Sequence, residues 1–327
     1  MYLVTGGAGF IGSNVARELA NSGARVVIND TFGTDDKWRN LAKHDIYDFV
    51  PPGGLDAWLA RHEGRLKGVV HMGAISATTE RDCDLIVASN FTLSLKLWDW
   101  CARHAAPFIY ASSAATYGDG AHGFDDVFTA TALAQLRPLN PYGWSKLAFD
   151  RRVLRAVNDG EPTPPKWAGL KFFNVYGPNE YHKGSMRSVV ALNWDKLSRG
   201  EPLRLFKSYR PDYGDGEQKR DFVYVKDCVA VIGWMLANPF EPGVYNIGSG
   251  LGCSWRQLGE AMFKAAGRPE MIEFIEMPEA LRARYQYFTQ ANINKLRSAG
   301  YAAPMHTLED GVGDYVAHYL SRDDPYA

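Results

Sequence analysis

Three glycines near the start of the chain constrain its fold more than any other feature. Tyr2-Leu3-Val4 is a short apolar run that predicts a β-strand, and Gly6-x-x-Gly9-x-x-Gly12 follows it almost at once. Apolar side chains then recur with helical spacing until Gly23. A strand, a glycine turn and a helix in this order allow the backbone to approach a pyrophosphate, which the helix N-terminus attracts. This opening therefore predicts a dinucleotide-binding unit within a parallel α/β sheet.

The next strand bears on which dinucleotide is bound. Arg25-Val26-Val27-Ile28-Asn29 predicts the second strand, and Asp30 stands at its end. An acidic side chain at this point accepts hydrogen bonds from the adenosine ribose, whereas a nearby cation accommodates a 2′-phosphate. Lys37 and Arg39 follow closely enough to supply that cation. The spacing alone leaves NAD and NADP equally open.

Further strand and helix signals continue the alternation. Gly68 to His71 predicts a strand, and the small-residue loop from Met72 to Ser76 can pass under the cofactor. Residues 82–104 carry an amphipathic pattern that predicts a long helix against the sheet. Residues 108–111 predict the next strand, and residues 112–116 lie at its carboxyl end, where open α/β sheets bind ligands.

The pattern changes near residue 173. Residues 169–173 predict a sixth strand, and beyond Asn174 the alternation loosens and the loops lengthen. We therefore expect an α/β fold with a doubly wound Rossmann parallel sheet over residues 1–173, which binds the dinucleotide. Residues 174–327 are expected to form mainly a smaller C-terminal α/β substrate-binding lobe, with some return of the chain to the first domain.

A tyrosine and a lysine lie one helical turn apart in Asn140-Pro141-Tyr142-Gly143-Trp144-Ser145-Lys146. If a helix begins near Gly143, both side chains point the same way. A nearby ammonium favours the phenolate and is expected to lower the pKa of Tyr142, so that the phenol can act as an acid or base. A single Tyr-x-x-x-Lys match is weak, and the preceding glycine turn and strands strengthen it.

Composition excludes several other classes of protein. The 327 residues carry a formal net charge of −1 without a long block of one sign, which argues against nucleic-acid or polybasic membrane binding. The four cysteines are widely spaced and predict no metal site. Met1 leads directly into an apolar strand and no apolar run is long enough to span a bilayer, so we expect a cytoplasmic protein with reduced thiols.

Longer motifs identify a family. Residues 5–12, residues 112–118 and Tyr142-x-x-x-Lys146 together resemble the extended short-chain dehydrogenase/reductase superfamily. Residues 173–178, 182–186, 219–225 and Arg284-Tyr285-Gln286-x-Phe288-Thr289-Gln290 are similar to the ADP-L-glycero-D-manno-heptose 6-epimerase family, which serves lipopolysaccharide inner-core synthesis. The resemblance covers essentially the whole chain.

The resemblance implies roles for individual residues. Tyr142 and Lys183 would be the two acid/base groups, Ser113 would hold the reacting oxygen, and Lys146 would hold the nicotinamide ribose. The family cofactor is NADP, one tightly bound per subunit, with NAD as the alternative. The implied cofactor residues are Gly6, Gly9, Phe10, Ile11, Gly12, Asp30, Thr31, Lys37, Met72, Gly73, Ala74, Ile75, Ser76, Asn90, Tyr142, Lys146, Val175 and Lys183. The implied substrate residues are Ser113, Asn174, Ser185, Phe206, Arg220 and Tyr285.

Stereochemistry explains why such an enzyme needs two bases. Removal of a hydride makes the carbinol carbon planar, and return of the hydride to the other face gives the epimer. For an exocyclic carbon, rotation about the bond to the ring exposes that face and also moves the oxygen, so one base cannot serve both half-reactions. Taken alone, Lys183 and Arg220 read as diphosphate-binding cations; the resemblance assigns catalysis to Lys183 and leaves Arg220 on the diphosphate.

Two departures from the family pattern leave the substrate open. Leu192 stands where the family usually has a histidine, and the loop from Tyr209 to Gln218 is longer than expected. The alternatives are a 4-epimerase or dehydratase acting on another nucleotide sugar, and, in a different class, a non-enzymatic NADP sensor. A sensor would not need Ser113, Tyr142 or Lys146. The resemblance also implies a homo-oligomer with a pentamer-like ring.

Overall fold

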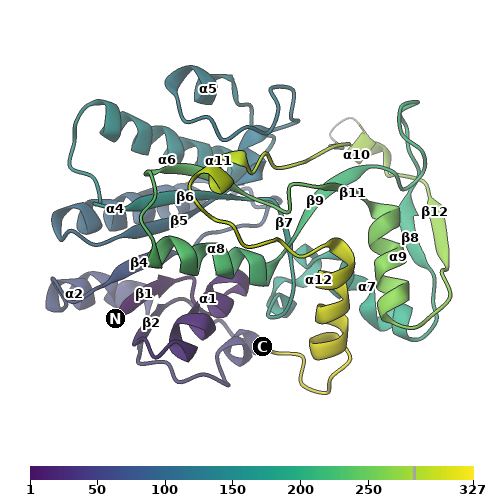
Figure 1. The fold of residues 1–327 in the computed structure, drawn as a ribbon, viewed down its shortest axis with the longest axis horizontal. Coiled ribbons are helices and arrows are strands. Elements are labelled where there is room, and N and C mark those ends of the chain that lie inside the picture. The colour runs from purple at the N-terminus through teal and green to yellow at the C-terminus, as the bar shows by residue number, and fades with distance from the viewer. Residues whose placement is uncertain (283–284) are drawn as a thin grey trace.

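The computed structural model describes residues 1–282 and 285–327, so that Arg284 of the last motif lies outside the described residues. Its centre is a seven-stranded sheet in the order β10-β6-β5-β4-β1-β2-β3, and every neighbouring pair is parallel (Figure 1). The predicted Rossmann fold is therefore confirmed. The strands are β1 (Tyr2–Thr5), β2 (Val26–Asn29), β3 (Asp48–Val50), β4 (Gly68–His71), β5 (Phe108–Ser113), β6 (Trp167–Phe172) and β10 (Gly243–Ile247).

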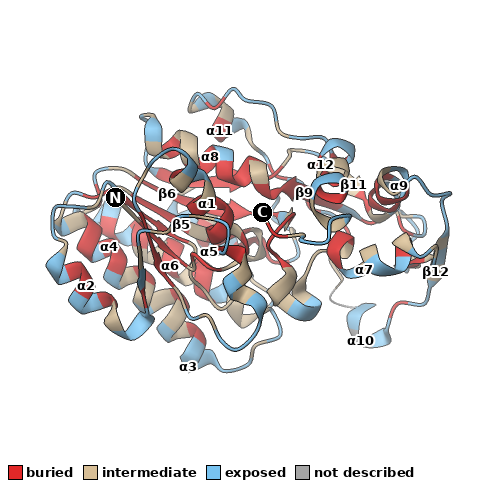
Figure 2. Ribbon diagram, turned by 90° about the horizontal axis from the view of Figure 1, so that it is seen from below, coloured by how far each residue is buried: buried red, intermediate tan, exposed pale blue. Residues whose placement is uncertain are grey.

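Helices cover both faces of this sheet, and this is why its strands are almost wholly apolar and buried (Figure 2). On one face, α1 (Phe10–Asn21) and α8 (Val225–Ala237) pack over the central strands. On the other face lie α2 (Leu55–Arg61), α4 (Leu93–Arg103) and α6 (Pro141–Asn158). The helix predicted over residues 82–104 is α3 (Cys83–Ile86), a π-helical segment η3 (Val87–Thr92) and α4 in succession.

Much of the chain beyond residue 173 forms a second cluster with its own apolar core. It contains a three-stranded sheet of β11 (Gly252–Ser254), β9 (Lys219–Tyr224) and β7 (Asn174–Tyr176), and a parallel pair of β8 (Leu203–Phe206) and β12 (Ile272–Ile275). The helices α7 (Val189–Ser198), α9 (Trp255–Ala265) and α12 (Leu308–Tyr315) pack with it. By contrast, β10 and α8 return to the large sheet.

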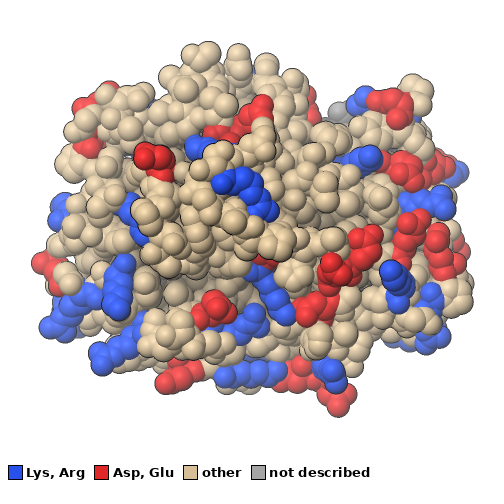
Figure 3. All heavy atoms as spheres, in the orientation of Figure 1, with Lys and Arg blue, Asp and Glu red and all other residues tan. Residues whose placement is uncertain are grey.

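Short elements complete the described chain, where η denotes 3-10 or π segments. Among the described helices, none combines the length and apolar character needed to cross a membrane. Acidic and basic side chains are interspersed over the face seen in Figure 3. The short elements are η1 (Asp36–Asn40), η2 (Pro52–Gly54), η4 (Ala114–Tyr117), α5 (Ala130–Gln135), η5 (Tyr181–Met186), α10 (Glu279–Arg282), α11 (Asn294–Ser298) and η6 (Val316–Leu320).

Candidate active site

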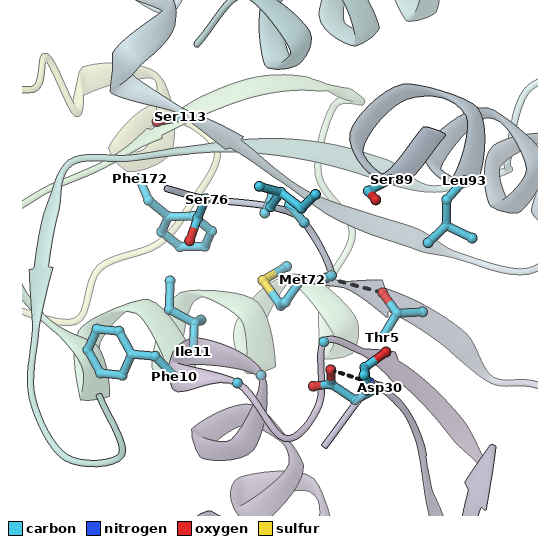
Figure 4. A pocket seen from close by; sticks show the side chains of 18 of the residues that line it. Thr5, Phe10, Ile11, Asp30, Met72, Ser76, Ser89, Leu93, Ser113 and Phe172 are labelled. Atoms are coloured by element: carbon cyan, nitrogen blue, oxygen red, sulfur yellow. Dashed lines mark hydrogen bonds between the residues drawn. The ribbon is translucent and has the colours of Figure 1, made fainter. Parts of the chain in front are cut away.

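A cradle of glycines opens a cavity of about 640 Å³ at the carboxyl edge of the sheet (Figure 4). Gly6 has φ +61°, and a Cβ there would lie 2.6 Å from the Cα of Gly73. A Cβ on Gly12 would lie 2.1 Å from the carbonyl oxygen of Gly6. The turn can therefore pack this closely against the loop of Gly73 and the start of α1 only because these side chains are absent, and the first turn of α1 borders the cavity. These features fit a dinucleotide pyrophosphate.

The cavity brings together nearly all of the predicted cofactor residues, although they come from segments far apart in the sequence. Figure 4 shows Phe10 and Ile11 on one side of it and Ser113 on another, with Phe172 and Ser76 drawn between them. The predicted residues that line it are Gly6, Gly9, Phe10, Ile11, Gly12, Asp30, Thr31, Lys37, Met72, Gly73, Ala74, Ile75, Ser76, Ser113, Tyr142, Lys146, Val175 and Lys183.

Asn90 supports the loop that borders the cavity, and its role as a cofactor ligand stays a prediction. Its side chain is fully buried; Oδ1 accepts from the backbone N–H of Ile75 at 2.8 Å and Nδ2 donates to the carbonyl of Ile75 at 3.0 Å. A second donation reaches the hydroxyl of Ser145 at 3.0 Å. Asn90 thus fixes the loop of residues 72–76 against α6.

Asp30 and Lys37 meet at the end of β2. The ammonium of Lys37 donates to Oδ1 of Asp30 and to the carbonyl of Thr31, each at 2.7 Å. The other carboxylate oxygen of Asp30 accepts from the backbone N–H of Ala8 at 2.9 Å. Arg39, the second candidate cation, instead pairs with Asp324 at 3.7 Å and does not line the cavity. Lys37 is therefore the basic group at this end of the cavity.

Tyr142 and Lys146 both enter the cavity from α6. The side chain of Asn140 caps this helix by accepting from Gly143 N–H at 2.8 Å, so the helix begins close to where it was predicted. The expected lowering of the Tyr142 pKa by Lys146 is wrong. Burial raises the pKa of Tyr142, and Ser113 beside it offsets part of that rise. Burial also lowers the pKa of Lys146 to about 8.

The same helix carries a buried carboxylate, Asp150, which sequence analysis missed. Asp150 accepts from the hydroxyls of Tyr110 at 3.0 Å and Ser112 at 2.7 Å. The ammonium of Lys171 lies 3.6 Å from the same carboxylate. Asp150 follows Lys146 by four residues, so its negative charge raises the pKa of Lys146 against the effect of burial. The four-residue spacing of Lys146 and Asp150 is the sequence signal that could have revealed this carboxylate.

Lys183 lines the same cavity but belongs to a different element, the short segment η5. Its ammonium lies 5.4 Å from the centre of the Phe10 ring, and burial lowers its pKa. Glu180 anchors the start of this segment, since its buried carboxylate accepts from Gly177 N–H at 3.2 Å and from the Ser188 hydroxyl at 2.7 Å. Lys183 is thus held at a fixed point above the glycine cradle.

The other predicted substrate residues lie outside this cavity, in the second cluster and at its border. Arg220 is buried between aromatic rings, 5.3 Å from the centre of Tyr285 and 5.8 Å from that of Trp255. Phe206 packs edge-on against Tyr285 at 6.3 Å. Asn174 and Ser185 are solvent-exposed.

The two departures from the family pattern also lie in the second cluster. In the longer loop, Arg210 lies 5.5 Å from the ring of Tyr213 and 5.1 Å from that of Tyr287. Leu192 is partly exposed on α7. Over residues 1–282 and 285–327, no three His, Cys, Asp or Glu side chains gather as a metal site would require.

The sheet, the glycine cradle and the Tyr142–Lys146 pair define a Rossmann enzyme that uses a nicotinamide dinucleotide. The family model described as "NAD dependent epimerase/dehydratase family" matches residues 2–248, and the chain belongs to this family. It is an epimerase, and therefore an isomerase, and within the family it groups with the ADP-L-glycero-D-manno-heptose-6-epimerases.

Named relatives support this grouping. Enzymes of that name from Fusobacterium nucleatum and from Nitratidesulfovibrio vulgaris strain Hildenborough are 46% and 47% identical, each over 100% of both chains. The crystal structure of the Helicobacter pylori enzyme of that name is 29% identical with a TM-score of 0.79, covering 97% of this chain and 95% of that one. A Thermus thermophilus UDP-glucose 4-epimerase in complex with NAD is 26% identical with a TM-score of 0.71, covering 97% and 98%.

Proposed function

We propose that this epimerase inverts C6 of ADP-D-glycero-D-manno-heptose to give ADP-L-glycero-D-manno-heptose, for lipopolysaccharide core synthesis. The observation that carries the proposal is that Tyr142 and Lys183, from different elements, line the same cavity as the glycine cradle. The names of the relatives supply the sugar and the nucleotide. Leu192 and the longer loop from Tyr209 to Gln218 are the places where recognition of this substrate would differ from the usual family pattern.

The glycine cradle and Lys146 would hold a nicotinamide dinucleotide, which would supply hydride transfer from and back to the carbinol carbon. Tyr142 is oriented by Ser113 toward the oxygen at that carbon and takes or gives its proton. Lys146 remains cationic below a pH of about 8 and holds the ribose hydroxyls beside the phenol. The raised pKa of Tyr142 keeps its phenol neutral, so that it carries the proton that the carbonyl oxygen needs when the hydride returns.

Lys183 would serve the second half-reaction, after the exocyclic carbon has rotated. A primary amine acts as a base only when it has lost its proton, and burial favours that state by lowering the pKa of Lys183. Glu180 opposes this by raising the same pKa, so the ammonium remains accessible as an acid. Each proton transfer of this kind typically contributes about 10²- to 10⁴-fold to the rate.

We infer that the cofactor is NADP, tightly bound. Lys37 supplies a cation at the end of β2, and its ammonium partly neutralises Asp30, the residue that would otherwise favour a free ribose 2′-hydroxyl. Thr31 borders the same end of the cavity. NAD is the alternative, since the carboxylate is still present.

Arg220, enclosed by aromatic rings, would bind the substrate diphosphate. A cytoplasmic homo-oligomer with a ring-like arrangement belongs to the same proposal.

One assay tests the reaction, and a second analysis tests the cofactor. Protein purified without added cofactor is incubated with ADP-D-glycero-D-manno-heptose, with UDP-glucose in parallel, and both are followed by NMR. Inversion at C6 of the heptose with UDP-glucose unchanged is the expected result. Turnover of UDP-glucose instead would favour the 4-epimerase alternative. Acid release of the bound nucleotide, followed by chromatography, distinguishes NADP from NAD.

A further inference from the structure

The segment from Asp324 to Ala327 crosses between two parts of the chain that line the cavity. After α12 and η6, the chain turns back and ends beside the N-terminal region near α1 (Figure 1). Its neighbours there are η1 with the residues that follow it, and the stretch from Asn179 to Tyr181. Lys37 belongs to η1, and Lys183 follows Tyr181 by two residues.

We call η1 and the residues that follow it the Lys37 side of the cavity, and the chain from Asn179 to Lys183 the Lys183 side. The C-terminal segment contacts the Lys37 side through both ionic and aromatic groups. The guanidinium of Arg39 lies 4.5 Å from the centre of the Tyr326 ring and 3.7 Å from the carboxylate of Asp324. The ammonium of Lys43 donates to the carbonyl of Tyr326 at 2.7 Å and pairs with Asp324 at 3.1 Å. Tyr326 is 8% exposed, so its ring is packed between elements rather than lying on the surface.

The contacts with the Lys183 side involve the same short segment. The Tyr181 hydroxyl donates to the carbonyl of Pro325 at 2.9 Å, and the rings of Tyr181 and Tyr326 meet edge to face at 5.1 Å. Asn179 accepts from the backbone N–H of Ala327 at 2.9 Å and donates to the hydroxyl of Ser13, on α1, at 3.0 Å. Asn179 holds a left-handed backbone with φ +73°, which costs free energy and persists only where surrounding contacts fix it.

We propose that Asp324 to Ala327 is a positioning segment for the epimerase reaction: it holds the Lys37 and Lys183 sides of the cavity together around the cofactor. This inference rests on the proposed function, because it takes Lys183 as one of the two acid/base groups. Arg39 and Tyr181 are each two residues from these lysines, so a shift at the Tyr326 contact reaches both. Without the segment, the two sides keep only direct contacts such as the one between Asn40 and His182 at 3.2 Å, so the cofactor leaves more readily and Lys183 becomes more exposed to solvent.

The test is Tyr326→Ala, with Tyr326→Phe as the conservative variant because it keeps the ring. The first readout is the rate at which acetic anhydride modifies Lys183 in the purified protein, measured by peptide mass spectrometry. Lys171, buried in the main core, is the internal reference for global unfolding. We expect Lys183 labelling to rise at least about tenfold relative to Lys171 in Tyr326→Ala, and to stay near wild type in Tyr326→Phe.

The second readout is the amount of dinucleotide retained after gel filtration, which we expect to fall severalfold. Phe240→Ala is the matched control, because it also removes a half-buried ring beneath a lysine, Lys166 at 5.8 Å, away from the cavity. If Tyr326→Ala does not fold, Lys43→Ala removes the contacts to Tyr326 and Asp324 and decides the question in the same assays. Unchanged Lys183 labelling and unchanged retention would overturn the inference.

These readouts also separate failure of the inference from failure of the proposed function. Labelling and retention do not depend on turnover of any sugar. If the heptose were not epimerised, a selective rise in Lys183 labelling would still support the positioning role. If the heptose were epimerised and Tyr326→Ala changed neither readout, the proposed function would stand and the positioning role would not.

Discussion

The carboxylate of Asp150, on the helix that carries Tyr142 and Lys146, lies 3.6 Å from the ammonium of Lys171 on β6, and both side chains are buried. The single negative charge of Asp150 thus acts on two buried lysines, Lys146 and Lys171. Its charge favours the ammonium form of Lys146, whose pKa burial lowers to about 8. The lysine that would hold the ribose therefore depends on a residue that does not touch the ligand.

Asp150→Asn should move the alkaline limit of activity to lower pH. Without the carboxylate, the pKa of Lys146 falls further and its positive charge is lost earlier as pH rises. We expect the ratio of kcat/KM at pH 8.5 to that at pH 6.5 to fall severalfold relative to wild type. Asp56→Asn removes an exposed carboxylate that pairs with Lys96 and is the control, with an unchanged profile. An unchanged profile in Asp150→Asn as well would reject the electrostatic role.

Tyr142→Phe and Lys183→Met should each reduce kcat by about 10²- to 10⁴-fold, because each removes one proton-transfer group. We expect each variant to bind the cofactor still, because neither change alters the glycine cradle. The measurement is single-turnover conversion of the heptose by NMR, with bound dinucleotide quantified in parallel. A double variant with near wild-type epimerisation would eliminate the two-base mechanism.

Gly12→Ala should abolish retention of the dinucleotide. The added Cβ would lie 2.1 Å from the Gly6 carbonyl oxygen, which is backbone and cannot rotate aside, so the cradle must deform. Gly9→Ala should be milder, because its nearest contact is the same atom at 3.0 Å. Acid release after purification measures the loss. Gly313→Ala in α12 meets nothing within 4 Å and should instead stabilise the fold by roughly 0.5–1 kcal/mol.

The sequence predicted the sheet and the cradle well because both depend on local signals. The glycine spacing, the apolar runs and the Asn-Pro helix start each act over a few residues, and the parallel sheet follows from their order. The sign of the Tyr142 pKa shift could not be predicted this way, because it is set by burial, which only the folded chain creates. The bonds by which Asn90 holds the loop at Ile75 could not be predicted either, because only the folded chain brings these residues together.

The short strand β3 and the packing of Tyr326 against Tyr181 escaped prediction for a related reason. Neither has a periodic pattern, since each is created by residues distant in the sequence. The assignment of Lys183 and Tyr142 to one cavity could not come from spacing either. It came from the family resemblance, and their catalytic roles remain predictions until the variants are measured.

His71 should make the fold sensitive to acid. Its ring is buried between the hydroxyls of Thr5 and Ser94, at 2.5 and 2.8 Å, and burial lowers its pKa to about 3 from the usual 6.5. Between these values the unfolded chain binds a proton that the folded chain does not, so stability is present above pH 6.5 and is lost as pH falls toward 3. Each unit of such a shift corresponds to about 1.4 kcal/mol.

Chemical denaturation of the wild type between pH 7 and 4 should therefore show the free energy of unfolding falling by a few kcal/mol. His71→Asn should reduce this dependence on pH, although it also lowers the stability at pH 7 by removing two buried hydrogen bonds. His122 is exposed, and His122→Asn is the control that should leave the dependence unchanged. An equally steep loss of stability in His71→Asn would mean that other buried groups, and not this histidine, govern the acid response.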